Sequence, residues 1–379
     1  MKKGSSILIM LHCEQNTGYA IGVLEQVFLE AARKSGYSDE EIFWSYKSVE
    51  ETATNIIQCD YKSVDQEFLY AFLTRNSINQ VIAFDLNYPS PVIDTLKRAR
   101  VKRVISYWGA GMSSINSGIK LIAKRLEWLL RSNKPDHFIF ESEAMRKTAT
   151  AGRGVPHNRT SVVPLGVDTQ TYRPDYGNYH YAHTLLGIPA DRKIVFYSGH
   201  MEERKGVRVI VKAAIELVDN QKNKGLHFVL CGNKGDEARV YQQLLKGTEA
   251  AEHVTFAGYR NDIADLMRSS FVGVIASTGW DSFTMSSVEM MASGLPLIVS
   301  NLQGLSETTI DNVTGFYITP GDYRELAERI GILSTSPTLA KDFSSAARLR
   351  AVNRFSRERQ VTDIAALLSA DSNQLSTNT

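Results

Sequence analysis

Short apolar runs alternate with amphipathic stretches along nearly the whole chain. In the first half, runs that are apolar at almost every position predict strands at 7–11, 81–84, 103–107, 137–140 and 160–163. Stretches with apolar residues three or four positions apart predict helices at 19–35, 92–100 and 118–132. Nearly continuous apolar strands separated by helices are typical of parallel sheets that are buried on both faces.

The same alternation begins again in the second half. Strands are predicted at 194–197, 227–230, 254–256, 272–275 and 297–299, and helices at 207–219, 237–247, 263–269 and 286–293. A last long helix, about 339–368, is expected to break near 353–356, and the polar residues that follow it to be disordered.

The two halves meet in a segment rich in proline, glycine and polar residues, from Pro164 to about Leu185. We therefore expect an α/β protein with two Rossmann-like, doubly wound parallel-sheet domains that face a cleft. The expected N-terminal domain is 1–165, completed by a helix at 355–370. The C-terminal domain is 166–354, and 371–379 forms a disordered tail.

Composition narrows the class of protein. The 379 residues are 43% hydrophobic and 22% charged, which is a globular composition for about two domains. A net charge of +2 gives no overall reason to expect nucleic-acid binding. Three dispersed cysteines lack zinc-site spacing, and the first apolar run is too short for a signal peptide. These features predict a soluble, cytoplasmic protein.

In open parallel sheets, ligands bind beyond the carboxyl ends of the strands, so the loops after strands carry the chemistry. Gly199, after the strand at 194–197, permits a tight turn, and Arg204 and Lys205 place two cations before the next helix. The positive N-terminus of a helix favours anions and disfavours these two cations. A diphosphate bound between them would offset this unfavourable interaction. The alternative is that both cations are solvated surface residues.

A second loop precedes the helix at 286–293. Asp281 lies in the loop, and the backbone N–H groups of about Phe283 to Ser286 form a helix entrance that could hold phosphate oxygens. Glu289 could accept hydrogen bonds from a ribose diol. Alternatively, Asp281 or Ser282 caps the helix and Glu289 forms a surface ion pair.

These segments resemble glycosyltransferase family 4, a family of retaining enzymes with the GT-B fold. The resemblance covers about 164–322 and rests on several motifs in order: Pro164–Asp168 with Arg173-Pro174, Val254–Tyr259, Asp281–Pro296, and Gln303–Glu307 followed by Asn312–Phe316. It implies that the C-terminal domain binds a nucleoside-diphosphate sugar, with UDP or GDP as the nucleotide. It further implies transfer with retention, without a metal ion or other cofactor.

The resemblance also implies roles for individual residues. Lys205 and Arg204 would neutralise the leaving diphosphate, and Asp281 would approach the donor sugar. The remaining donor contacts implied are Gly199, His200, Tyr259, Arg260, Phe283, Thr284, Met285 and Glu289. Three departures stand out: His200 replaces an arginine, Asp281 replaces a glutamate, and Ser282 and Thr284 replace glycines.

The first half resembles the family less closely. Gly18 stands where the family has a glycine-rich loop, and Trp108 stands where many members place a histidine. With Asp85 after the strand at 81–84, they are the acceptor-side candidates. Trp108 either stacks on a sugar or is a core or rim aromatic, and Asp85 either contacts the acceptor or caps a loop.

The acceptor is expected to be a carbohydrate or a lipid-linked molecule. The predicted helix at 118–132 combines basic and apolar residues, which suits peripheral contact with the inner membrane face. The alternative is a helix that packs on its sheet with a solvated basic face. Two other functions stay open: a sugar phosphorylase, or a non-catalytic nucleotide-sugar-binding subunit. The absence of a G-x-G-x-x-G motif after the first strand disfavours an NAD enzyme.

Overall fold

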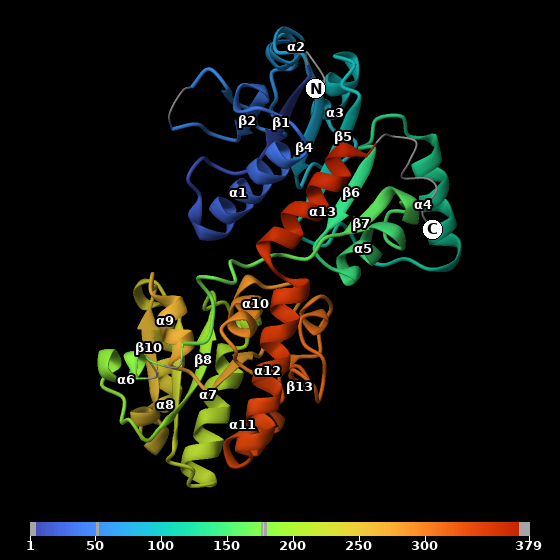
Figure 1. Cartoon of the computed structure of the whole chain (residues 1–379). Coiled ribbons are helices and arrows are strands. Elements are labelled where there is room, and N and C mark those ends of the chain that lie inside the picture. Colours follow the sequence, from blue (N-terminus) through green and yellow to red (C-terminus); the bar gives the residue numbers. More distant parts are fainter. Residues whose placement is uncertain (1–4, 51–52, 176, 178–179, 371–379) are drawn as a thin grey trace. The chain divides into compact units, whose positions relative to one another are not determined.

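The computed structural model describes residues 5–50, 53–175, 177 and 180–370. The tail predicted at 371–379 lies outside these residues. The chain divides into two compact units (Figure 1). Unit 1 comprises Met1–Pro164 and Glu358–Thr379, and unit 2 comprises Leu165–Arg357.

Unit 1 is built on a seven-stranded sheet in the order β3-β2-β1-β4-β5-β6-β7, in which every pair of neighbours is parallel. The strands are β1 (Ser6–Met10), β2 (Ile42–Tyr46), β3 (Ile56–Gln58), β4 (Ile78–Phe84), β5 (Arg103–Trp108), β6 (His137–Phe140) and β7 (Thr160–Val162). The helices are α1 (Gly18–Lys34), α2 (Gln66–Arg75), α3 (Pro91–Arg98), α4 (Gly118–Leu130), α5 (Glu143–Thr150) and α13 (Arg357–Ser369). Buried side chains fill both faces of the sheet as two separate clusters.

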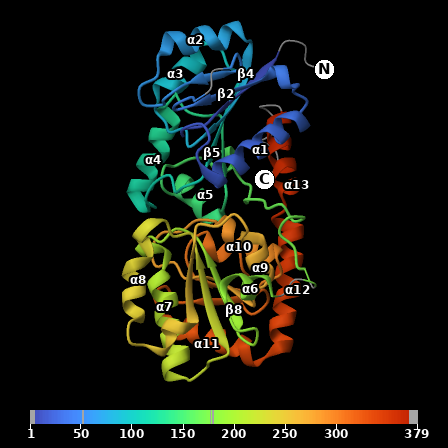
Figure 2. The ribbon, with the colours of Figure 1, turned by 90° about the vertical axis from the view of Figure 1, so that its left-hand side faces the viewer.

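Unit 2 repeats the plan with a six-stranded parallel sheet in the order β10-β9-β8-β11-β12-β13. Its strands are β8 (Lys193–Ser198), β9 (Leu226–Cys231), β10 (Val254–Gly258), β11 (Val272–Ile275), β12 (Leu297–Ser300) and β13 (Gly315–Ile318). Its helices are α6 (Tyr181–Leu186), α7 (Val207–Ile215), α8 (Arg239–Leu245), α9 (Ile263–Arg268), α10 (Met285–Ala292), α11 (Tyr323–Thr335) and α12 (Pro337–Arg354). Figure 2 shows helices on both sides of this sheet.

The prediction of two doubly wound parallel-sheet domains is confirmed. The strand order reverses between β1 and β4 in unit 1 and between β8 and β11 in unit 2. These are the positions at which doubly wound sheets bind ligands. The break predicted in the last helix is also present, because α12 ends at Arg354 and α13 begins at Arg357.

Several local predictions were incomplete. The structure adds the strands β2, β3 and β13 and the helices α2, α5, α6 and α11. The helix predicted at 237–247 begins as a 3-10 turn, and α8 proper is only seven residues long. The helix predicted at 207–219 is α-helical to Ile215 and then widens into a π turn.

Candidate functional site

The reversal point of the unit 2 sheet brings together two loops that carry charged side chains. One loop follows β8 and ends in a 3-10 turn at Glu203–Lys205, and the other follows β11 and leads into α10. Lys205 and Asp281, 76 residues apart in sequence, form an ion pair with 2.8 Å between Nζ and Oδ1. Their side chains are only 16% and 5% exposed.

Asp281 is held at both carboxylate oxygens. The hydroxyl of Ser277 donates to Oδ2 at 2.5 Å, while Oδ1 accepts from Lys205 and from the backbone N–H of Ser282. The backbone N–H of Asp281 is 3.4 Å from the side-chain oxygen of Gln303, in the loop after β12. Residues from three loops thus hold Asp281, two of these loops bind its carboxylate, and its orientation is set by the fold.

Arg204, next to Lys205, is exposed and links the same two loops. Its guanidinium donates to the carbonyl oxygen of Trp280 at 3.0 Å and pairs with Glu202 at 2.7 Å. Its backbone carbonyl accepts from the N–H of Thr278 at 2.8 Å. Arg204 therefore ties the loop after β8 to the loop that carries Asp281.

The close approach of these loops depends on Gly206, the N-cap residue before α7, which has φ of 76°. A Cβ atom on this residue would lie 1.7 Å from the carbonyl oxygen of Ala276. Only glycine accommodates both the left-handed backbone and this contact. A larger residue would push Lys205 away from Asp281.

The side chain of the N-cap residue leaves the first N–H groups of α10 uncapped. The helix begins after Thr284 without a side-chain cap and without an acidic residue in its first turn. The alternative that Asp281 or Ser282 caps this helix is wrong, because Asp281 is already held by Ser277 and Lys205 and the N-cap position belongs to Thr284. Thr284 donates its hydroxyl to that of Ser287 instead. The positive end of this helix lies just after the Asp281 loop.

The other donor-side candidates differ in how far their side chains are buried or packed against other parts of the protein. Phe283 packs its buried ring against Phe355 at 5.1 Å, so only its backbone is free to contact a ligand. Glu289 is buried on α10, which argues against a surface ion pair. Met285 starts the same helix and is half-buried.

The residues after β8 and β10 complete the donor-side set. Gly199 packs directly on Gly232, and the carbonyl of exposed His200 accepts from the hydroxyl of Tyr197 at 2.7 Å. Tyr259 is 57% exposed, with the ammonium of Lys234 at 4.8 Å from its ring centroid. Arg260 is engaged by Asp262, so it would have to leave this carboxylate to meet a nucleobase.

Sequence reasoning missed two of the residues that build this site. Ser277 and Gln303 hold Asp281 from two loops, and neither was given a role. Ser277 is the second residue after β11, so its place near the carboxyl end of a strand was a usable signal. Gln303 is close to Asp281 only through the pairing of β11 with β12, which the sequence does not display.

In unit 1, the acceptor-side candidates Gly18 and Asp85 follow β1 and β4, the strands at the reversal point, and Trp108 ends the next strand, β5. Asp85 has φ of 52° and accepts a hydrogen bond from the backbone N–H of Gly109 at 3.0 Å. Burial raises its pKa to about 6. Trp108 is a core residue, because it is 7% exposed and its indole donates to Ser106 at 2.8 Å. Gly18 begins α1 with φ of 70° and has open space around it.

A buried carboxyl group that the sequence did not single out lies beside Asp85. Glu141 follows β6, accepts from the hydroxyl of Tyr107 at 3.4 Å and is 6% exposed. Burial, with the charge of Asp85 nearby, raises its pKa to about 8. At neutral pH this carboxyl group is mainly protonated.

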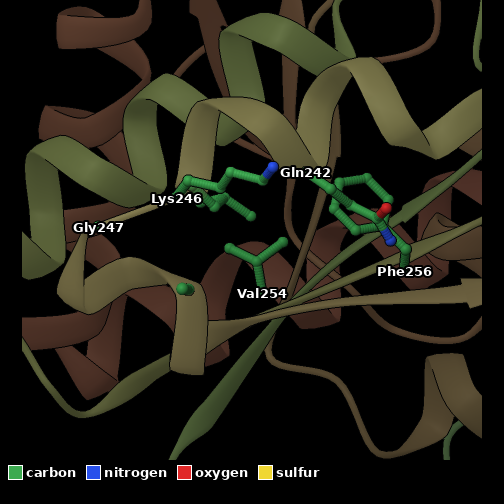
Figure 3. Close-up of a pocket in the computed structure, with 7 residues that line it drawn as sticks. Gln242, Lys246, Gly247, Val254 and Phe256 are labelled. Carbon is green, nitrogen blue, oxygen red and sulfur yellow. The ribbon is translucent and has the colours of Figure 1, made fainter.

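A hollow elsewhere in unit 2 does not belong to this site. Figure 3 shows it between α8 and β10, lined by Gln242, Leu245, Lys246, Gly247, Ala251, Val254 and Phe256. Val254 begins β10, whereas Lys205 and Asp281 follow the carboxyl ends of their strands.

None of the helices in the described part of the chain is both long and apolar enough to cross a bilayer.

Comparison with known proteins agrees with the family suggested by the motifs. Residues 183–350 match the model of the family described as Glycosyl transferases group 1. A relative from Bacillus subtilis (strain 168), named "Putative glycosyltransferase EpsD", is 30% identical over 220 residues, which are 57% of this chain and 56% of the relative. The chain thus spans about half the length of that relative.

Solved structures match over almost the whole chain. A glycosyltransferase from Rickettsia africae ESF-5 superposes with a TM-score of 0.78 at 15% identity, covering 99% of this chain and all of that one. Anabaena Alr3699/HepE in complex with UDP superposes with a TM-score of 0.75 at 21% identity, covering 96% and 99%. At these identities the likeness concerns the fold, and the GT-B architecture is confirmed.

Proposed function

We propose that this chain, whose residues 183–350 match the glycosyl transferases group 1, moves a sugar from a nucleoside-diphosphate sugar to a hydroxyl acceptor. The proposed reaction retains the anomeric configuration, needs no metal ion, and serves polysaccharide or glycolipid assembly. The observation that carries the proposal is the Lys205–Asp281 pair at the reversal point of the sheet, beside the uncapped entrance of α10. Cation and helix end together suit a pyrophosphate.

In the proposed reaction, the leaving diphosphate gains charge as its bond to the anomeric carbon breaks. Lys205 and the N–H groups at the entrance of α10 would stabilise that charge, and Arg204 would keep the two loops together. The acceptor hydroxyl would attack from the same face as the departing oxygen, to which its proton passes. Because the protein then contributes position and charge, it needs no covalent nucleophile.

Asp281 has a different role in this proposal. Its carboxylate is fixed by Ser277 and Ser282, so it can accept a hydrogen bond from a hydroxyl of the donor sugar once the diphosphate draws Lys205 toward itself. Glu289 would bind the ribose hydroxyls, and Tyr259 would lie near the base. In unit 1, Asp85 and Gly18 are the proposed acceptor-side residues, and a lipid-linked acceptor would bring the enzyme into peripheral contact with a membrane.

A two-step experiment tests the proposal. A thermal-shift screen with uridine, guanosine and adenosine diphosphates identifies the nucleotide, and its sugar conjugates are then tested for slow release of nucleoside diphosphate. Release shows a working donor site. Stabilisation by nucleotides without release from any conjugate would favour a non-catalytic binding subunit. Absence of any shift, together with turnover that requires free phosphate, would favour a sugar phosphorylase.

A further inference from the structure

Helix α4 of unit 1 presents an apolar face to solvent. The exposed fractions along this face are Ile119 86%, Ile122 57%, Leu126 55%, Leu129 69% and Leu130 87%. Spacings of three and four residues place these side chains on one stripe of the helix. The alternative of a helix that packs on its sheet with a solvated basic face holds only in part: α4 packs through Trp128, its one buried residue, but most of its apolar residues are exposed along with its cations.

The direction of this stripe is fixed by packing on the opposite face. Trp128 contacts the rings of Tyr88 and Phe138, with centroids 5.5 Å and 5.9 Å away. The backbone of α4 also rests directly on Gly154, where an added Cβ would lie 2.6 Å from the amide nitrogen of Arg125. The helix is held by its inner face, so the outer stripe is a stable feature of the surface.

Positive charge flanks the stripe. The segment 118–134 contains five cations and one acid: Lys120, Lys124, Arg125, Arg131, Lys134 and Glu127. The acid is neutralised locally, because Glu127 pairs with Lys124 at 2.8 Å and with Arg131 at 2.7 Å. Lys120 and Arg125 are exposed on either side of the stripe. A surface that combines an apolar stripe with uncompensated cations is complementary to an anionic lipid headgroup layer.

We propose that this face of α4 docks the protein on an anionic bilayer. The stripe from Ile119 to Leu130 enters the boundary between headgroups and acyl chains, and Lys120 and Arg125 meet the lipid phosphates. A second copy of the chain is a poorer occupant, since pairing two such faces brings like charges together. The docking face is in unit 1 and the donor-site residues are in unit 2, so this inference and the donor-site proposal can fail separately.

The test is co-sedimentation of the full chain with vesicles. We expect binding to vesicles of equal parts phosphatidylcholine and phosphatidylglycerol, weakening with added salt, and no binding to phosphatidylcholine alone. Two variants remove the apolar stripe and the positive charge separately. I119S/L126S/L130S removes the stripe, and K120E/R125E removes the charge. Each should weaken binding by about tenfold or more. The matched controls L349S and K341E, at exposed positions of α12, should bind as the native chain does.

Three results would overturn the inference. One is anionic-vesicle binding that neither variant reduces. Another is that the native chain does not bind vesicles but forms a dimer in sedimentation velocity, and that I119S/L126S/L130S is a monomer. The face would then be covered by a second copy of the chain. The last is a loss of vesicle binding that is accompanied by an equal loss of nucleoside-diphosphate binding in solution, because the substitutions would then act through the fold.

Discussion

The ammonium of Lys205 lies 2.8 Å from a carboxylate oxygen of Asp281, and both side chains are largely buried. The two residues lie in the loops after β8 and β11, the neighbouring strands at which the sheet order reverses. Asp281 therefore pairs with the cation that we assign to the donor diphosphate. In the proposed reaction, the donor diphosphate must compete with Asp281 for Lys205. Removing the ion pair should therefore lower the stability of the protein but raise its affinity for the diphosphate.

Replacing Asp281 by asparagine should separate these two effects. The variant leaves Lys205 without its anion, so we expect a loss of about 2–4 kcal/mol in the free energy of unfolding. Diphosphate binding should become tighter, because the competing carboxylate is gone, while turnover should fall. Urea unfolding and calorimetry measure both, with D342N as an exposed control. A variant with unchanged stability and weaker diphosphate binding would refute this competition.

Glu289→Gln tests the ribose contact. A carboxylate that accepts from the ribose diol should contribute about 1.5–3 kcal/mol, so the variant should bind the nucleoside diphosphate about tenfold or more weakly. The 2′,3′-dideoxy nucleotide should bind the native chain and the variant equally, since the contact is already absent. Equal losses for both nucleotides would show that Glu289 acts through the fold.

Gly206→Ala tests the close approach of the two loops. Alanine there would meet the carbonyl of Ala276, in addition to the cost of a positive φ. We expect a loss of more than about 2 kcal/mol in the free energy of unfolding, together with weaker diphosphate binding. Gly247→Ala is the matched control, because Gly247 has φ of 79° but open space around it. Its cost should be about 1 kcal/mol, with binding unchanged.

The buried carboxyl of Glu141 should make stability depend on pH. Because its pKa is raised from 4.5 to about 8 in the folded protein, the native state holds a proton that the unfolded state releases. Stability should therefore fall as the pH rises from about 4.5 to about 8, with a contribution of up to about 1.4 kcal/mol per pH unit.

Glu141→Gln should remove this component of the pH dependence. Glu40→Gln, at an exposed position, should keep the native profile. Asp85→Asn should lower the pKa of Glu141, since the charge of Asp85 contributes to its rise. Unfolding free energies at several pH values measure all three variants, and an unaltered profile for Glu141→Gln would contradict the assignment.

The fold class was predictable because the strands of both sheets are buried on both faces and therefore read as apolar runs. Three strands escaped prediction: β3 and β13, which lie at the sheet edges and have three and four residues, and β2, which has five. Such segments are specified by pairing with a neighbouring strand, and pairing is not visible in local sequence. The same reason hides Gln303, which reaches Asp281 from the next strand's loop.

At the site, the sequence placed Lys205 and Asp281 in the right loops but did not pair them. Spacing identifies which side chains follow strands, whereas contacts between two loops depend on strand order. The sequence left two alternatives open for α4, membrane contact or packing on the sheet, because a helix with apolar residues on one face is normally expected to bury them. Only its packing through Trp128 on the other face shows which side is covered.

The measurement that tests the account most directly is calorimetric titration of the native chain and Lys205→Ala with the best-stabilising nucleoside diphosphate. Losing a charged contact to the diphosphate should weaken binding about 10–100-fold. Lys224→Ala, a cation on the surface of unit 2, should bind as the native chain does. Equal dissociation constants for the native chain and Lys205→Ala would contradict the claim that this lysine holds the pyrophosphate.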